Sequence, residues 1–294
     1  MMKPYQLGLY EKSMPGSLSI EEKLQETGNA SFDYLELSID ETDEKLARLE
    51  WGKDEISAIN RAAEESGIPV KSICLSGHRK FPMGDPDAET RGKSLSIMER
   101  ALTLAARLGV RIIQIAGYDV YYKKSTEETK KFFAENLEKS VHLAAREGVI
   151  LAFETMETPF IDTVEKAMNW VKKFPSPYLQ VYPDTGNITN AALLYGTTVP
   201  GDIEKASGHL AALHLKESKP GIYREVPYGE GHVNFGEAIA AAWREGCRRY
   251  VAEFWHSAPK SGEADRWRTI LHDNSIYLRD ILDKAVVDTA EKYR

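Results

Sequence analysis

Short apolar runs alternate with amphipathic helical patterns along the whole chain. The runs are rich in β-branched and aromatic residues, which is typical of buried parallel strands. Eight units of one strand and one helix favour a closed barrel, because five or six units more often form an open sheet. We therefore predict a single (β/α)₈ TIM barrel, one domain over residues 1–294. The predicted strands are residues 5–10, 34–39, 70–75, 111–116, 150–155, 179–182, 211–215 and 250–255.

Polar and glycine residues mark where the predicted helices start and stop. Ser125 and Thr126, followed by two glutamates, provide a hydroxyl cap and an acidic first turn. Gly109, Gly148 and Gly246 each follow a helical stretch and precede an apolar run. Because glycine tolerates the left-handed backbone that commonly ends a helix, these positions predict the turns from helix to strand.

Composition narrows the class of protein. The 45 acidic residues outnumber the 38 basic ones and give a net charge of −7, which offers no general attraction for nucleic acid or an anionic membrane. No apolar run approaches the roughly 18 residues that span a bilayer. Cys74 and Cys247, the only cysteines, lie far apart in apolar runs and are expected to be reduced core thiols. We expect a soluble, cytoplasmic protein without a nucleic-acid or membrane partner.

Four polar residues close successive predicted strands, and they carry the candidate chemistry. Glu154, Asp184, His214 and Glu253 follow the apolar runs of strands five to eight, at intervals of 30, 30 and 39 residues. Functional groups of such barrels sit at the carboxyl ends of the strands, so these side chains should converge. Three carboxylates and one imidazole suit one divalent ion, Mn²⁺, Co²⁺, Mg²⁺ or Zn²⁺, with coordination positions left open. The alternative for each residue is a polar group that only bonds the backbone of its loop.

A divalent ion in such a site can polarise the ketone of a sugar and acidify the adjacent C–H. A carboxylate on each face of the resulting enediolate can then remove a proton from one side and return one to the other, which inverts that carbon. Glu154 and Glu253, on strands five and eight, are candidates for this pair. The sequence leaves open which of them abstracts the proton and which donates it.

Several longer motifs resemble one known family. They are residues 76–82 (SGHRKFP), 114–122 (QIAGYDVYY), 182–187 (YPDTGN), 214–221 (HLKESKPG) and 227–235 (PYGEGHVNF). Together they resemble the L-ribulose-5-phosphate 3-epimerases, also called L-xylulose-5-phosphate 3-epimerases, within the xylose-isomerase-like TIM barrels. The resemblance runs from the first predicted strand to beyond Trp255.

This resemblance implies a metal-ligand set and a reaction. The family's Glu, Asp, His, Glu pattern falls on the four strand-end residues already selected, with the two glutamates as acid and base. The implied reaction interconverts L-xylulose 5-phosphate and L-ribulose 5-phosphate by inversion at C3, a step of pentose and L-ascorbate breakdown. Two departures concern substrate preference: Glu217-Ser218 stands where relatives often carry Asp-Thr, and Phe254 where Met is common.

Other residues near the strand ends are candidates for binding substrate. They are His78, Arg79, Asn187, Lys216 and Trp255. His78 and Arg79, in the loop after strand three, form a cationic pair that can hold a phosphate or a sugar hydroxyl. Lys216 shares the strand face of His214, which lies two residues before it. Each has a structural alternative: a salt bridge for Lys216, a turn cap for Asn187 and a core aromatic for Trp255.

Three other functions would use the same fold. An aldose–ketose isomerase or an epimerase of free sugars needs the same ligands, and Arg79, Lys216 and Lys219 in the loops favour a phosphorylated ketopentose over these. Endonuclease IV shares the barrel but needs three zinc ions and more histidine ligands than the seven histidines here provide. A catalytically idle sugar-binding barrel would look the same at the level of the fold. We also expect a homodimer, because barrels of this size commonly pair through their helical shell.

Overall fold

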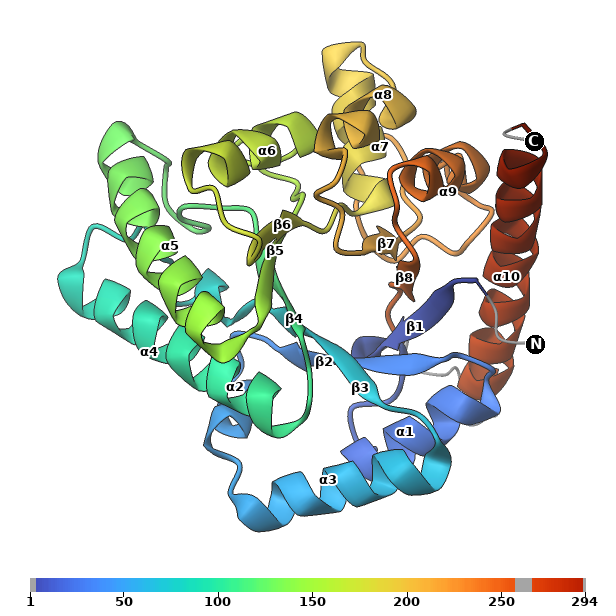
Figure 1. Cartoon of the computed structure of the whole chain (residues 1–294), viewed down its shortest axis with the longest axis horizontal. Coiled ribbons are helices and arrows are strands. Elements are labelled where there is room, and N and C mark those ends of the chain that lie inside the picture. The colour runs from blue at the N-terminus through green and yellow to red at the C-terminus, as the bar shows by residue number, and fades with distance from the viewer. Residues whose placement is uncertain (1–3, 257–265, 293–294) are drawn as a thin grey trace.

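A computed structural model describes residues 4–256 and 266–292 of the chain. Its strands form one parallel sheet, surrounded by helices (Figure 1). The strands are β1 (Gln6–Tyr10), β2 (Tyr34–Ile39), β3 (Val70–Leu75), β4 (Ile112–Ala116), β5 (Ile150–Glu154), β6 (Leu179–Val181), β7 (Leu213–Leu215) and β8 (Arg249–Ala252). The predicted (β/α)₈ barrel is thereby confirmed. The predicted domain of 1–294 also includes residues 1–3, 257–265 and 293–294, which lie outside the described residues.

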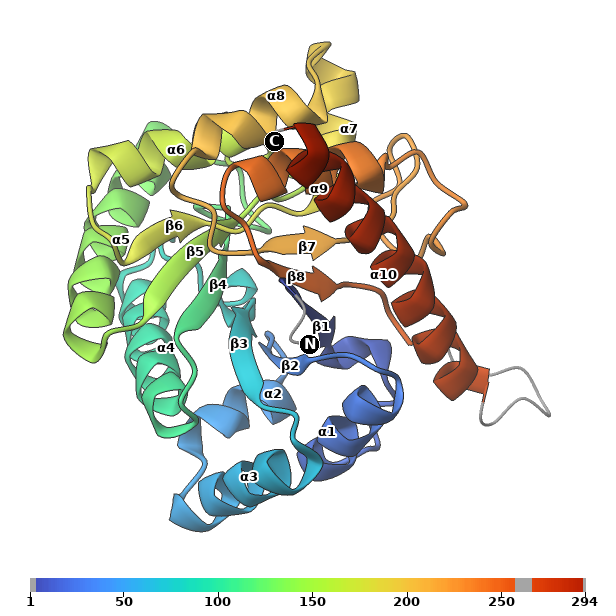
Figure 2. The same ribbon diagram turned by 45° about the vertical axis from the view of Figure 1, so that its right-hand side comes forward.

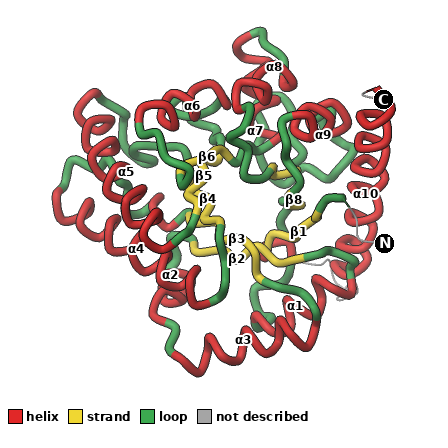
Figure 3. Tube along the Cα trace, in the orientation of Figure 1, coloured by secondary structure: helices red, strands yellow, loops and turns green. Residues whose placement is uncertain are grey.

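The sheet curls into a ring (Figure 3). The strand order is β6-β5-β4-β3-β2-β1-β8-β7, so β1 pairs with both β2 and β8. Between β6 and β7 the ladder is reduced to two isolated bridges, Val181 with Leu210 and Asp184 with His214. The second bridge joins two of the predicted metal ligands through their backbones.

Helices cover the outside of the ring. The rotated view in Figure 2 shows that α10 packs beside α9 and β8. They are α1 (Ile20–Asn29), α2 (Asp43–Ala47), α3 (Lys53–Ser66), α4 (Ala88–Arg107), α5 (Glu127–Glu147), α6 (Val164–Lys173), α7 (Thr185–Tyr195), α8 (Val199–Ile203), α9 (Phe235–Arg244) and α10 (Arg266–Lys292). Short 3₁₀ turns occupy residues 11–13, 48–50, 77–79 and 204–206. In the part of the chain described, no helix is both long enough and apolar enough to cross a membrane.

The predicted helix signals act as expected. Thr126 caps α5, its hydroxyl accepting from the backbone N–H of Thr129. Gly148 ends the same helix with a φ of 66°, and Gly109 and Gly246 have φ values of 71° and 89° at the other two predicted turns. Since side chains are strained at such angles, glycine is the residue that these turns require.

Several strand boundaries differ from the prediction. The structure starts β1 and β4 one residue later, ends β5 and β6 one residue earlier, and shortens β7 to Leu213–Leu215. Strand β8 begins at Arg249 and ends at Ala252, so Glu253 lies just beyond it. The shortening of β6 and β7 follows from the isolated bridges at this seam, because a strand is defined by a continuous ladder.

Apolar side chains form two layers of core. A large cluster fills the space between strands and helices, and a smaller one fills the ring with side chains from all around the sheet, namely Tyr10, Tyr34, Cys74, Ile112, Ala152, Tyr182, Ala212 and Val251. Tyr34 fits inside because β1 carries Gly8 opposite it, where an added Cβ would come within 2.3 Å of the ring. Both cysteines are free and buried, as predicted.

Candidate metal centre

The four predicted ligands come from four successive βα units. Glu154 is the last residue of β5, His214 is the middle residue of β7, and Glu253 follows β8 directly. Asp184 caps α7, where its Oδ1 accepts from the backbone N–H of Asn187 at 2.7 Å. Each ligand therefore lies in a strand, directly after one or at the start of a helix, where regular structure positions it.

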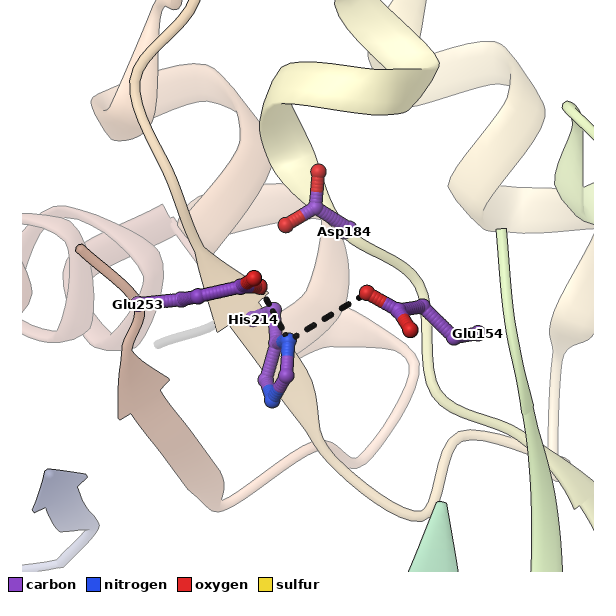
Figure 4. A group of neighbouring side chains, drawn as sticks. All are labelled: Glu154, Asp184, His214 and Glu253. Carbon is purple, nitrogen blue, oxygen red and sulfur yellow. Dashed lines mark ion pairs between the residues drawn. The ribbon is translucent and has the colours of Figure 1, made fainter. Parts of the chain in front are cut away.

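Their side chains converge (Figure 4). One ligand atom from each residue can be chosen so that all four lie within 4.8 Å of one another, and all four side chains are buried. His214 Nδ1 lies 2.5 Å from Glu253 Oε2 and 3.7 Å from Glu154 Oε1. Ligands on opposite sides of one divalent ion are about 4.5 Å apart. The cluster therefore has the dimensions of a site for a single ion.

Electrostatics at the cluster favour an added cation. Burial raises the pKa of Glu154 and that of Asp184, and neighbouring carboxylates raise both further. Burial opposes ionisation of Glu253 too, but Lys216 and His214 outweigh it and hold its pKa below the ordinary range. Lys216 and His214 thus do not fully compensate the negative charge of three ionised carboxylates, and a bound cation would help all three to ionise.

One carboxylate oxygen of Asp184 is also available to bind a cation. Asp184 Oδ2 is buried and has no hydrogen-bond partner among the described residues, although its Oδ1 is satisfied. A buried oxygen of this kind is costly unless something binds it. The donor set, three oxygens and one nitrogen without thiolate, suits the hard and borderline ions predicted. The residues present therefore fit one divalent ion, and their role as its ligands stays a prediction.

Both nitrogens of the His214 ring contact groups that the sequence analysis missed. Glu36 on β2 lies with its Oε1 2.6 Å from His214 Nε2, and the amide Nε2 of Gln114 on β4 lies 3.1 Å from Nδ1. Tyr182 packs edge-on against the ring, with centroids 4.8 Å apart. Glu36 is a lone charge in a strand that is buried throughout, and this was the signal available in the sequence.

Two of the predicted substrate-binding residues, Lys216 and Asn187, lie next to the four predicted metal ligands. Lys216 Nζ lies 2.9 Å from Asp184 Oδ1 and also donates to Asn187 Oδ1 at 2.9 Å. The Asn187 amide donates to the backbone carbonyl of Thr155 at 2.6 Å. Both side chains are buried. Lys216 forms the salt bridge that its structural alternative assumed, and Asn187 bonds the backbone, so both have structural roles. Lys216 also lies beside the predicted metal ligand Asp184.

His78 and Arg79, adjacent in the loop after β3, lie in different surroundings. His78 is buried, with Nε2 3.1 Å from the Ser94 carbonyl, and burial lowers its pKa to about 4. Its imidazole is therefore neutral at pH 7, so the predicted cationic pair of His78 and Arg79 is wrong for His78, and Arg79 is the member that carries charge. Arg79 stacks over Tyr121, 4.6 Å from the ring centroid, and pairs with Glu41 at 3.6 Å.

A chain of contacts links Arg79 to the metal cluster. Tyr121 donates to Glu157 Oε1 at 2.9 Å, and Arg224 pairs with the same oxygen at 3.1 Å. The Arg224 guanidinium lies 5.9 Å from the ring of Trp255, and Lys216 Nζ lies 6.0 Å from it. Half-buried Trp255 therefore lies beside both Lys216 and Arg224. Arg224 was not selected from the sequence because it lies far along an exposed loop.

Comparison with known proteins places this geometry in a family. A family model described as a xylose isomerase-like TIM barrel matches residues 22–271. L-ribulose-5-phosphate 3-epimerase UlaE of Escherichia coli O1:K1 is 38% identical over 266 residues, 90% of this chain and 92% of that protein. The protein of the same name from Shigella boydii serotype 18 is 37% identical over the same shares.

Solved structures agree on the fold. D-psicose 3-epimerase from Clostridium cellulolyticum H10, solved with D-tagatose, has a TM-score of 0.78 at 17% identity, covering 94% of this chain and 99% of that one. A structure of L-ribulose 3-epimerase has a TM-score of 0.76 at 16% identity, covering 99% and 98%. The resemblance inferred from the sequence motifs is thus confirmed: the chain belongs to the L-ribulose-5-phosphate 3-epimerase family, a group of carbohydrate epimerases within the xylose isomerase-like TIM barrels.

Proposed function

We propose that the protein is a metal-dependent 3-epimerase that interconverts L-xylulose 5-phosphate and L-ribulose 5-phosphate. The observation that carries the proposal is the convergence of Glu154, Asp184, His214 and Glu253 within 4.8 Å at the carboxyl ends of the strands. The relatives named L-ribulose-5-phosphate 3-epimerase, which align over 90% of the chain, support the choice of substrate.

The four residues would hold one divalent ion. Such an ion, when bound, polarises the C2 ketone and the neighbouring hydroxyl of the sugar, so that the C3–H becomes acidic. Lys216, 2.9 Å from Asp184, adds a fixed positive charge beside the same oxygens. Because the cluster is buried, both charges act in a medium of low polarity, where they stabilise an enediolate more than water would.

Two glutamates would carry the proton at C3. Glu154 and Glu253 approach His214 from opposite sides in Figure 4, at 3.7 Å and 2.5 Å from its Nδ1. A ketose bound between them would present one face of C3 to each carboxylate. Removal of the proton on one face and return on the other inverts the carbon. In the reverse direction the two exchange roles, so each serves once as base and once as acid.

Exchange of the C3 proton in D₂O tests these two roles. We expect the metal-loaded protein to incorporate deuterium at C3 of L-xylulose 5-phosphate, followed by NMR. Glu154→Gln and Glu253→Gln should each abolish conversion to L-ribulose 5-phosphate, because one remaining carboxylate can exchange the proton on its own face of C3 but cannot deliver one to the other face. Circular dichroism checks that both variants keep the fold. Near wild-type conversion in either variant would contradict the two-base assignment, and exchange at C1 would indicate an aldose–ketose isomerase instead.

Binding of the phosphate is proposed for the loop side of the site. Arg79 stacks over Tyr121, which donates to Glu157, and Arg224 pairs with the same Glu157. Arg224 also lies 5.9 Å from the ring of Trp255. Bidentate arginine contacts favour phosphate oxygens. His78 would add only a neutral imidazole, and Asn187 would act through Lys216.

Substrate comparison tests the phosphate preference. We expect kcat/KM for L-xylulose 5-phosphate to exceed that for L-xylulose by at least about 100-fold, since each charge-assisted contact contributes about 1.5–3 kcal/mol. Arg79→Met and Arg224→Met should reduce the ratio and leave turnover of free L-xylulose unchanged. Equal turnover of the two sugars by the wild type would point to a free-ketose epimerase. Pairing as a homodimer and a cytoplasmic location stay predictions.

A further inference from the structure

Glu36 is a buried carboxylate with an unusual set of partners. Its side chain is 0% exposed, in the middle of β2, and points into the ring of strands. Among the described residues no lysine or arginine donates to it; its hydrogen-bond donors are Ser72, Tyr182 and His214. A buried charge is costly unless it is paired and fully hydrogen-bonded. Of these three donors, His214 is the one that can carry a positive charge.

Both carboxylate oxygens of Glu36 are held in place. Oε1 lies 2.6 Å from His214 Nε2, while Oε2 accepts from Tyr182 Oη at 2.9 Å and from Ser72 Oγ at 2.7 Å. Ser72 is the residue opposite Glu36 in the β2–β3 ladder, so its hydroxyl is positioned by strand register. The carboxylate therefore reaches across the barrel from β2 to β7 in one orientation.

The two nitrogens of His214 face different carboxylates. An ion bound on the Nδ1 side, beside Glu253 and Glu154, would leave the imidazole hydrogen on Nε2, which lies 2.6 Å from the Glu36 carboxylate. Nδ1 is the nitrogen that faces Glu253 and Glu154 (Figure 4). An imidazole whose outer N–H donates to a carboxylate is a more basic ligand and has a fixed ring orientation.

We propose that Glu36 is a positioning residue of the metal centre, which orients His214 and raises the affinity of the site for its ion. The inference rests on the metal site of the proposed function and adds a residue to it. Glu36 lies behind His214, on the side away from Glu154 and Glu253, so it acts on the ligand and does not touch the sugar.

Metal titration of a conservative variant tests this role. Mn²⁺ is added to metal-free protein and the free ion is measured by electron paramagnetic resonance. Glu36→Gln keeps the shape of the side chain and removes its charge, so we expect Mn²⁺ to bind about 10–100-fold more weakly. Because Glu36 does not touch substrate, turnover by the variant should largely return at saturating Mn²⁺.

Asp119 offers a matched control. It is also buried, and its Oδ2 accepts from the hydroxyls of Ser125 and Thr129, but no metal-ligand contact connects it to the cluster among the described residues. Asp119→Asn should therefore bind Mn²⁺ within about twofold of the wild type even if it unfolds at a lower temperature. Equal weakening in this variant would mean that loss of any buried carboxylate loosens the site, and would overturn the proposal.

A spectroscopic measurement separates positioning from packing. In Zn²⁺-loaded protein labelled with ¹⁵N-histidine, the Nε2–H proton of His214, assigned with His214→Gln, should resonate far downfield and move upfield in Glu36→Gln. If that variant does not fold, Tyr182→Phe removes one donor to Glu36 and should weaken Mn²⁺ binding by about two- to fivefold.

The failures of the two proposals are distinguishable. If the wild type binds no Mn²⁺, the metal centre itself is wrong. If the wild type binds Mn²⁺ but Glu36→Gln or Tyr182→Phe binds it equally well, the metal centre stands and the role of Glu36 is wrong.

Discussion

At the scale of single residues, the strongest electrostatic feature outside the metal cluster is Glu11. It follows β1 and is fully buried, and its carboxylate accepts from Lys23 at 3.0 Å, Lys45 at 2.6 Å and Arg48 at 2.5 Å. The backbone N–H of Ser38 also donates to it, at 2.8 Å. Three cations from α1, α2 and the turn after it thus meet on one carboxylate, which ties these segments to the carboxyl end of the sheet.

Replacement of Glu11 by glutamine should destabilise the protein by about 3–5 kcal/mol, because the three cations would stay buried without a counter-charge. Urea unfolding measures the loss. Glu64→Gln, on an exposed position of α3, is the control and should unfold like the wild type. A wild-type unfolding midpoint for Glu11→Gln would contradict this role.

The same group predicts a pH dependence. Burial alone would raise the pKa of Glu11, but Arg48, Lys23 and Lys45 outweigh it and lower the pKa from 4.5 to about 2. A lowered carboxyl pKa contributes stability that is fully present above the unfolded value and is lost as the pH falls through the folded one. The stability difference between wild type and Glu11→Gln should therefore shrink between about pH 4.5 and pH 2. A difference that stays constant over this range would count against the lowered pKa.

At the scale of elements, the packing of β1 against β2 depends on one glycine. Gly8 leaves the space that the Tyr34 ring occupies inside the barrel, and Tyr34 in turn donates to the Tyr250 carbonyl on β8 at 3.0 Å. A Cβ at position 8 would lie 2.3 Å from that ring, closer than real atoms approach. The contact therefore joins three neighbouring strands through one aromatic side chain.

Gly8→Ala should lower the stability by about 1–3 kcal/mol, since overpacking forces the ring or the strand to move. Thermal unfolding measures the effect. Gly16→Ala is the matched control, because an added Cβ there meets nothing within 4 Å, and it should change stability by less than about 0.5 kcal/mol. Equal effects of the two substitutions would show that the Gly8–Tyr34 contact is not special.

Strand positions were largely predictable from the sequence, for a physical reason. Parallel strands buried on both faces read as continuous apolar runs, and turn glycines such as Gly148 bound them. The ends of β6 and β7 were not predictable, because the isolated bridges at that seam depend on how the ring closes. Local sequence carries no information on that closure.

Site residues divide in the same way. Glu154 and Glu253 could be selected because each closes an apolar run, and the barrel brings strand ends together. The lone charge of Glu36 in an apolar run was a signal, but neither its partner nor that of Arg224 could be predicted, because these partners lie across the ring or across loops: His214 is 178 residues from Glu36, and Glu157 is 67 residues from Arg224. Such contacts are set by tertiary structure alone.

At the scale of the whole molecule, the fold separates stability from chemistry. The apolar clusters between sheet and helices and inside the ring hold the strands, while the four predicted metal ligands lie at the carboxyl ends. This division is general for (β/α)₈ barrels and lets loops change the substrate without altering the core. Here the cluster of four ligands lies on the strand ends, and the arginines that would choose a phosphate lie on the loops.

One measurement tests the central claim most directly. Metal-free protein is titrated with Mn²⁺ while conversion of L-xylulose 5-phosphate to L-ribulose 5-phosphate is followed. The rate should rise with added ion and reach its plateau at one equivalent per chain, because Glu154, Asp184, His214 and Glu253 form one site. Full conversion by the chelated protein, or no conversion at any Mn²⁺ concentration, would contradict a metal-dependent epimerase at this cluster.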